Sequence, residues 1–162
     1  MNERYEIFVS KDSFKFNAAH FMAYPGYRER LHGHNYRVAV RIEGKLNADG
    51  YVIDFADVKQ AARAVCGEMN ERVLVPARSD CLVVDVKDGC VSVECEDGSR
   101  FAFPEADCVL LPIAHSSAEE LAAYVCRRLV DALPGLGTRG VHAVEVAVAE
   151  APAQEARFRL EL

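Results

Sequence analysis

The chain has 162 residues, enough for one domain with a sizeable core, and its 51% hydrophobic and 27% charged residues are ordinary for a globular protein. Its formal net charge of −6 at pH 7 argues against general nucleic-acid binding, although a small phosphorylated substrate needs only a local group of cations. No apolar run is long enough to cross a bilayer, and the charged N-terminal residues lack a signal peptide's apolar stretch, so we expect a cytoplasmic protein.

Two segments near the N-terminus are predicted to be β-strands. Hydrophobic and polar residues alternate along residues 4–20 and again along residues 33–43, which is typical of strands with one buried face. Residues 21–31, which contain a Pro-Gly pair, are predicted to form the loop between them, and residues 47–50 to form a turn.

A helix is predicted next, with Asp54 as its N-cap residue. Apolar residues then recur at helical spacing, at Val58, Ala61, Ala62, Val65 and Met69. Pro76 marks a stop beyond this helix. Residues 81–104 have the alternation and the two Asp-Gly turns of a small β-meander. Because this segment interrupts the larger pattern, we interpret it as an insertion.

A second helix is predicted to begin at a capping-box signature, Ser116-Ser117-Ala118-Glu119-Glu120. Its apolar stripe consists of Leu121, Val125, Leu129 and Leu133. Residues 141–149 and 155–162 are predicted to be the last two strands. The expected order is two strands, a helix, a meander, a helix and two strands, in a single domain that spans residues 1–162.

The six cysteines form neither a Cys-x-x-Cys pair nor a zinc-finger spacing. A chain of this size in a reducing compartment needs no disulfide framework. We therefore expect reduced thiols with a structural role.

Three of the five histidines fall in one early stretch of the chain. His32 and His34 are two positions apart, so on a strand their side chains leave on the same face, and Gly33 between them allows a close approach. His20 ends an alternating run that begins at Phe14. If the two strands pair, the three imidazoles can converge.

Three neutral imidazoles with one open position make up the usual catalytic zinc site, so we predict Zn²⁺. Iron, nickel and copper also accept imidazole ligands, and a structural histidine cluster is the alternative. A cupin-like iron site is disfavoured, because such sites usually place a carboxylate soon after the His-x-His pair, whereas Arg37-Val38-Ala39-Val40 follows here.

Charged residues lie just before the histidine pair. Glu29, three residues before His32, is either a solvated loop charge or a general acid/base beside the metal. Arg28 and Arg30 flank it, where they would lower its pKa or bind substrate phosphate.

Four further residues are candidates for the same site. Glu150 ends a predicted strand, where a partly buried carboxylate needs either an arginine such as Arg157 or a ligand edge with two N–H donors. Ser116 and Ser117 open a helix, where they serve as caps or contact a ligand. His115, just before them, is placed where it could face the same ligand.

Together these residues resemble the 6-pyruvoyl-tetrahydropterin synthase and 6-carboxytetrahydropterin synthase family. The resemblance runs from about Ser13 to Glu150, without the meander. The segments that carry it are Phe16-Asn17-Ala18-Ala19-His20, Leu31-His32-Gly33-His34-Asn35-Tyr36, Val52-Ile53-Asp54-Phe55 and Ser116-Ser117-Ala118-Glu119-Glu120-Leu121-Ala122.

The resemblance implies an α+β tunnelling fold, in which a four-stranded antiparallel sheet is packed by two helices. It also implies a homo-oligomer, usually a hexamer, with active sites at subunit interfaces. By position, His20, His32 and His34 correspond to the zinc ligands, and Glu150 to the acid that anchors the pterin ring. Ser116 and Ser117 fall in the segment that contacts the pterin.

Two departures from the family pattern bear on the reaction. Arg28 stands where the family has its catalytic cysteine, with Glu29 beside it, and a subgroup of the family has this same glutamate arrangement. The family's Asp-His pair is replaced by Asn70-Glu71. Glu29, Glu71 or His115 would therefore have to move the proton.

The resemblance predicts a zinc-dependent lyase that cleaves the side chain of 7,8-dihydroneopterin triphosphate to 6-hydroxymethyl-7,8-dihydropterin. The alternatives are 6-pyruvoyl or 6-carboxy synthase activity, a zinc-containing pterin-binding protein without turnover, or a zinc-stabilised oligomeric module with no pterin site.

Overall fold

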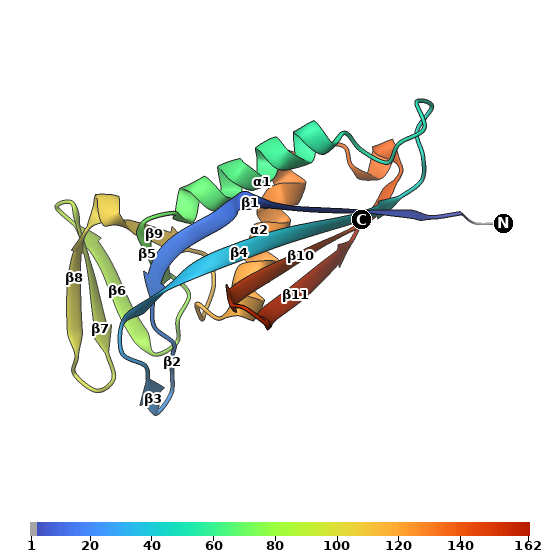
Figure 1. The fold of residues 1–162 in the computed structure, drawn as a ribbon. Helices are drawn as coiled ribbons and strands as arrows, with labels where there is room; N and C mark the ends of the chain where they lie inside the picture. Colours follow the sequence, from blue (N-terminus) through green and yellow to red (C-terminus); the bar gives the residue numbers. More distant parts are fainter. Residues whose placement is uncertain (1–2) are drawn as a thin grey trace.

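A mixed six-stranded sheet forms the centre of the computed structural model, which describes residues 3–162 (Figure 1). The strand order is β11-β10-β4-β1-β5-β9. The strands are β1 (Tyr5–His20), β4 (His32–Gly44), β5 (Arg72–Pro76), β9 (Cys108–Leu111), β10 (Val141–Ala151) and β11 (Gln154–Glu161).

The sheet is larger than the predicted one. The four expected antiparallel strands are present as β11-β10-β4-β1, but β5 and β9 extend the β1 edge in parallel orientation. Each added strand is a short apolar run without clear alternation, so periodicity alone does not separate it from other buried segments. Parallel partners are also joined by long connections, which leave no local signal in the sequence.

Two helices, α1 (Phe55–Met69) and α2 (Ala118–Ala132), pack on one face of the sheet (Figure 1). Both predicted N-caps are confirmed. The Asp54 carboxylate accepts a hydrogen bond from Ala56 N at 2.7 Å, and Ser117 Oγ accepts one from Glu120 N at 3.2 Å. Within residues 3–162, neither helix is long and apolar enough to span a membrane.

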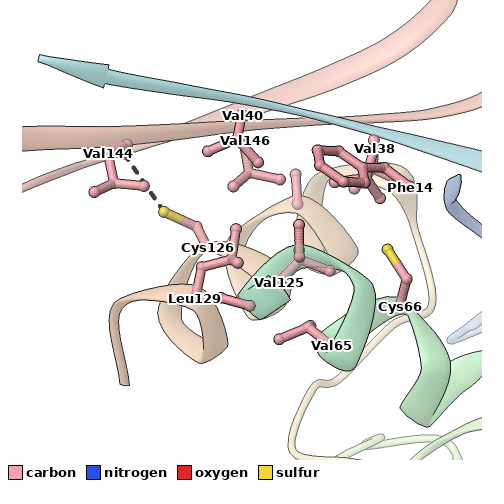
Figure 2. Close-up of a cluster of buried hydrophobic side chains, with 14 of the residues drawn as sticks. Phe14, Val38, Val40, Val65, Cys66, Val125, Cys126, Leu129, Val144 and Val146 are labelled. Atoms are coloured by element: carbon pink, nitrogen blue, oxygen red, sulfur yellow. Dashed lines mark hydrogen bonds between the residues drawn. The ribbon is translucent and has the colours of Figure 1, made fainter. Parts of the chain in front are cut away.

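The apolar faces of the helices and the sheet form the main core (Figure 2). Valines of β4 and β10 lie over the helices, and Val65 of α1 and Val125 of α2 face them from below. Cys66 and Cys126 are buried in this core, and Cys126 Sγ lies 3.4 Å from the carbonyl oxygen of Val144. All six cysteines are free, as predicted.

The predicted meander is present as a separate three-stranded sheet at one end of the molecule (Figure 1). Its strands are β6 (Leu82–Lys87), β7 (Cys90–Cys95) and β8 (Arg100–Pro104). The loop between β1 and β4 contains a small hairpin, β2 (Ala23–Tyr24) and β3 (Tyr27–Arg28). Two short 3₁₀ helices, η1 (Glu105–Asp107) and η2 (Gly137–Arg139), precede β9 and β10.

Candidate active site

Pairing of β1 with β4 brings the three predicted histidines together. In this antiparallel register, His20 lies opposite His32 and Ala18 opposite His34. The ring centroids of His20 are 4.7 Å from His32 and 5.2 Å from His34. One ligand atom of each histidine lies within 4.8 Å of the others. The predicted convergence of the imidazoles is therefore confirmed.

Backbone carbonyls orient two of these rings. His20 Nδ1 lies 2.9 Å from the carbonyl oxygen of Ser116, and His32 Nδ1 lies 2.7 Å from that of Arg30. A carbonyl oxygen only accepts hydrogen bonds, so both Nδ1 atoms carry the proton. The lone pair of each ring then resides on Nε2, which is the arrangement that second-sphere carbonyls give metal-bound histidines.

The donor set fits a metal ion. His20 Nε2 is buried and, among the described residues, has no hydrogen-bond partner. Burial first, and then the neighbouring His32 and His34, lower the pKa of His20 to about 4, so the ring is neutral at pH 7, as a metal ligand must be. The Nε2 atoms of His32 and His34 are 3.1 Å apart, and two nitrogen ligands of one tetrahedral zinc lie about 3.3 Å apart.

A cavity of about 300 Å³ opens over the histidines. Four glutamates line it, namely Glu29, Glu119, Glu150 and Glu155. Among the described residues that line this cavity there is no lysine or arginine. A cation placed among the three imidazoles would therefore meet a field of negative charge that favours it.

Glu29 is held at the edge of this cavity by its own loop. Its backbone N–H donates to the carbonyl oxygen of Met22 at 2.9 Å, and its Oε2 accepts from Met22 N at 2.9 Å. Within residues 3–162, the hydrogen bonds of this carboxylate involve Oε2 alone. Oε1 is thus the oxygen that remains available to a ligand.

Glu150 also faces the histidines. It lies where the β10–β11 register shifts, between Ala149 and Ala151, and such a bulge re-aims a side chain. Its Oε1 is 4.0 Å from His20 Nε2. Arg157, the alternative partner considered from the sequence, binds Glu155 instead. The carboxylate is thus placed to receive a ligand in the cavity.

The two serines occupy different layers of the site. Ser117 lines the cavity, whereas Ser116 is fully buried behind His20. Ser116 Oγ lies 3.2 Å from the carbonyl oxygen of Phe21 and 3.0 Å from His20 Nδ1. His115 is turned toward Glu120, whose Oε1 lies 3.2 Å from His115 Nδ1.

The remaining candidates lie outside the cavity lining in the described chain. Arg28 binds Asp97 and Ser99 of the meander, and Arg30 is exposed. Glu71 has a left-handed backbone with a φ of 58° and lines a neighbouring groove. His34 lines both the groove and the cavity, so the two are adjacent.

Sequence reasoning missed several lining residues. Glu119 follows the N-cap of α2, and Gln154 and Glu155 begin β11, so each is close along the chain to a predicted site residue. Tyr36, to which the sequence assigns no role beyond the motif, is fully buried next to His34, and its hydroxyl has no partner among the described residues. Burial raises the pKa of this hydroxyl, so it stays protonated.

Comparisons with known proteins agree with this geometry. Residues 9–161 match the sequence model of 6-pyruvoyl tetrahydropterin synthase. The crystal structure of 6-pyruvoyl tetrahydropterin synthase from Plasmodium vivax superposes with a TM-score of 0.94 at 41% identity, covering 99% of this chain and 100% of that one. The Plasmodium falciparum enzyme gives 0.95 at 40% identity over the same shares.

Two other comparisons concern the reaction. A Methanocaldococcus jannaschii protein named 6-carboxy-5,6,7,8-tetrahydropterin synthase is 29% identical over 130 residues, which is 80% of this chain and 79% of that protein. Variants of the P. vivax enzyme replace a catalytic glutamate by alanine or cysteine, and they superpose with TM-scores of 0.94 and 0.95.

Proposed function

The chain belongs to the 6-pyruvoyl tetrahydropterin synthase family, a family of pterin-metabolising lyases, and we propose that it acts on the side chain of 7,8-dihydroneopterin triphosphate. One observation carries the proposal. Glu29 and the three histidines line a single cavity. In the sequence, Glu29 directly follows Arg28, which occupies the position of the family's catalytic cysteine. A catalytic glutamate in the P. vivax relative supports this role.

His20, His32 and His34 would hold the zinc. When bound, zinc acts as a Lewis acid that makes the side-chain hydroxyls of the substrate more acidic. Glu29, with Oε1 unengaged among the described residues, takes a proton from the substrate side chain and returns it. Glu150 accepts two N–H groups of the pterin ring, and Ser117 contacts the same ring.

The product distinguishes three candidate reactions. The names of the solved relatives favour the 6-pyruvoyl product, in which triphosphate leaves and all side-chain carbons stay, and the archaeal relative favours the 6-carboxy product. Two replacements favour the 6-hydroxymethyl product: Arg28 at the position of the family's catalytic cysteine, and Asn70-Glu71 in place of the Asp-His pair. In that case the bond between the first two side-chain carbons breaks, and a two-carbon aldehyde carries the triphosphate away.

Incubation of the zinc-loaded protein with 7,8-dihydroneopterin triphosphate, followed by chromatography and mass spectrometry of the pterins, tests the proposal. A 6-pyruvoyl, 6-carboxy or 6-hydroxymethyl product supports lyase activity and identifies the reaction. Tight pterin binding without any product would instead leave a zinc-containing binding protein. No measurable pterin binding in the wild type, and none lost in Glu150→Ala, would indicate a module without a pterin site.

The cations for the triphosphate come from outside the cavity lining, since no described lining residue is a lysine or an arginine. A hexamer with cavities at subunit interfaces would supply them from a second copy. This assembly and a cytoplasmic location remain predictions, and sedimentation analysis tests the former.

A further inference from the structure

We infer that Arg28 and the meander turn between β7 and β8, residues 96–99, form a clamp that positions Glu29 over the histidines. Arg28 is then a positioning residue and not a phosphate ligand. This inference rests on the proposed catalytic role of Glu29. It also gives the inserted meander a function, because the insertion supplies the other half of the clamp.

Every nitrogen of the Arg28 guanidinium has a protein partner. Nε donates to Asp97 Oδ2 at 2.9 Å, and Nη2 donates to Ser99 Oγ at 3.0 Å. Nη1 donates to the backbone carbonyl oxygen of Glu29 at 2.9 Å. One planar group therefore joins the meander turn directly to the backbone of the proposed proton-transfer residue.

The surroundings of Arg28 hold this arrangement in place. Its guanidinium carbon lies 5.8 Å from the ring centroid of Phe21 and 5.7 Å from that of Phe101. The side chain is only 20% exposed. Asp97 is in turn fixed by Ser99 N, which donates to Oδ1 at 2.9 Å. A substrate phosphate could bind Arg28 only by displacing these partners.

A second contact ties the same loop to the same turn. Gly26 N, at the tip of the β2–β3 hairpin, donates to Glu96 Oε2 at 3.0 Å. Below it, Phe21 and Ala23 are buried in an apolar cluster that joins the meander to β5 and β9, and the Phe21 ring stacks on Phe101 with centroids 5.0 Å apart. Figure 1 shows the hairpin and the meander at the same end of the molecule.

The base of this loop, at Phe21 and Ala23, shares an apolar cluster with Val75 of β5 and Cys108 of β9. In the described chain, β2 and β3 pair only with each other. The Glu29 side chain is bound by Met22, which belongs to the same loop, so that contact sets its conformation but not its place relative to β4. Beyond this base, the hydrogen bonds of Gly26 and Arg28 to the meander turn hold the part of the loop that carries Glu29.

Substitution of Arg28 separates a clamp from a phosphate ligand. Arg28→Gln should lower kcat about 10- to 100-fold with KM within about twofold, because misplacing a reacting group by about 1 Å costs up to about 100-fold. Arg28→Lys should not restore kcat, since the donors of an ammonium group lie on a single nitrogen and cannot reproduce the planar fork that reaches all three partners. In a Glu29→Ala background, Arg28→Gln should add no further loss. Asp97→Asn should lower kcat in the same direction.

The matched control is Arg100→Gln, which removes an arginine of the same meander that pairs with Glu94. It should leave kcat and KM unchanged. A raised KM with unchanged kcat in Arg28→Gln, or wild-type kinetics in Arg28→Lys, would overturn the clamp and favour phosphate binding.

Hydrogen–deuterium exchange gives a readout that does not need turnover. Arg28→Gln and Asp97→Asn should speed amide exchange across residues 21–31, whereas Arg100→Gln should not. Unchanged exchange in Arg28→Gln would overturn the clamp even in an inactive protein. A wild-type protein without turnover would overturn the proposed function, and the exchange data would still decide the clamp.

Discussion

His20 Nδ1 lies 2.9 Å from the carbonyl oxygen of Ser116, although 96 positions separate the two residues in the chain. This contact fixes the tautomer and the direction of the His20 ring. It also connects the segment before α2 to the end of β1, so the candidate metal ligands and the segment proposed to contact the pterin are positioned together.

Zinc should bind once per chain and stabilise the protein. His20 Nε2 is buried without a partner among residues 3–162, and it converges with His32 and His34. His20→Ala or His34→Ala should therefore abolish binding, measured by mass spectrometry of metal content. At a free zinc concentration about 1,000 times Kd, the gain in unfolding free energy is about 4 kcal/mol. The control is His142→Gln, which should bind zinc as wild type does. Full zinc content in His20→Ala would contradict the assignment of His20 as a zinc ligand.

Stability of the metal-free protein should fall as the pH drops below 6.5. The pKa of His20 is about 4 in the folded protein against an ordinary 6.5, so the unfolded chain takes up the proton first. The free energy of unfolding should therefore decrease between pH 6.5 and 4, by about 3 kcal/mol in total. Chemical denaturation at several pH values measures this slope. His20→Asn should reduce the dependence of the unfolding free energy on pH. An equal pH dependence in that variant would show that His20 is not its cause.

Glu150→Gln should weaken pterin binding. An amide replaces a carboxylate that would accept two N–H groups, and loss of a charge-assisted hydrogen bond costs about 1.5–3 kcal/mol, or about 10- to 100-fold in Kd. Fluorescence titration with neopterin measures the change. Glu119→Gln removes the same charge from the same cavity and serves as the control. Equal losses of pterin affinity in both variants would show that the net charge of the cavity, and not a specific contact of Glu150, determines the affinity.

Thiol reactivity should divide the cysteines by burial. Burial raises the pKa of Cys66 to about 12 and that of Cys126 to about 11, so neither forms appreciable thiolate at pH 8. Both should react with a disulfide reagent only after unfolding, whereas the half-buried Cys81 and Cys90 should react in the native protein. Peptide mapping identifies the labelled sites. Rapid labelling of native Cys66 would show that the core opens.

Local patterns predicted much of this molecule. Alternation located β1 and β4, and it placed His20, His32 and His34 on strands that had only to pair in one register. The N-caps of α1 and α2 were visible because a capping hydrogen bond spans three residues at most.

The roles of single polar side chains depended on partners far along the chain. Arg28 was equally consistent with binding a phosphate or lowering the pKa of Glu29, and its actual partner Asp97 is 69 residues away. His115 was a candidate for proton transfer, but Glu120 binds its ring. A sequence shows which groups a side chain offers, and it does not show which of several distant groups will reach it.

By itself, the sequence determined the helices, four of the strands, the meander and the histidines of the candidate metal site, because each depends on spacing within a short segment. The antiparallel pairing of those four strands was implied by the family resemblance. Only the tertiary structure decided the parallel strands β5 and β9, the place of Ser116 behind His20, and the attachment of the Glu29 loop to the meander. These features arise when separate elements dock, and docking is governed by shape and by contacts between distant residues that no local periodicity encodes.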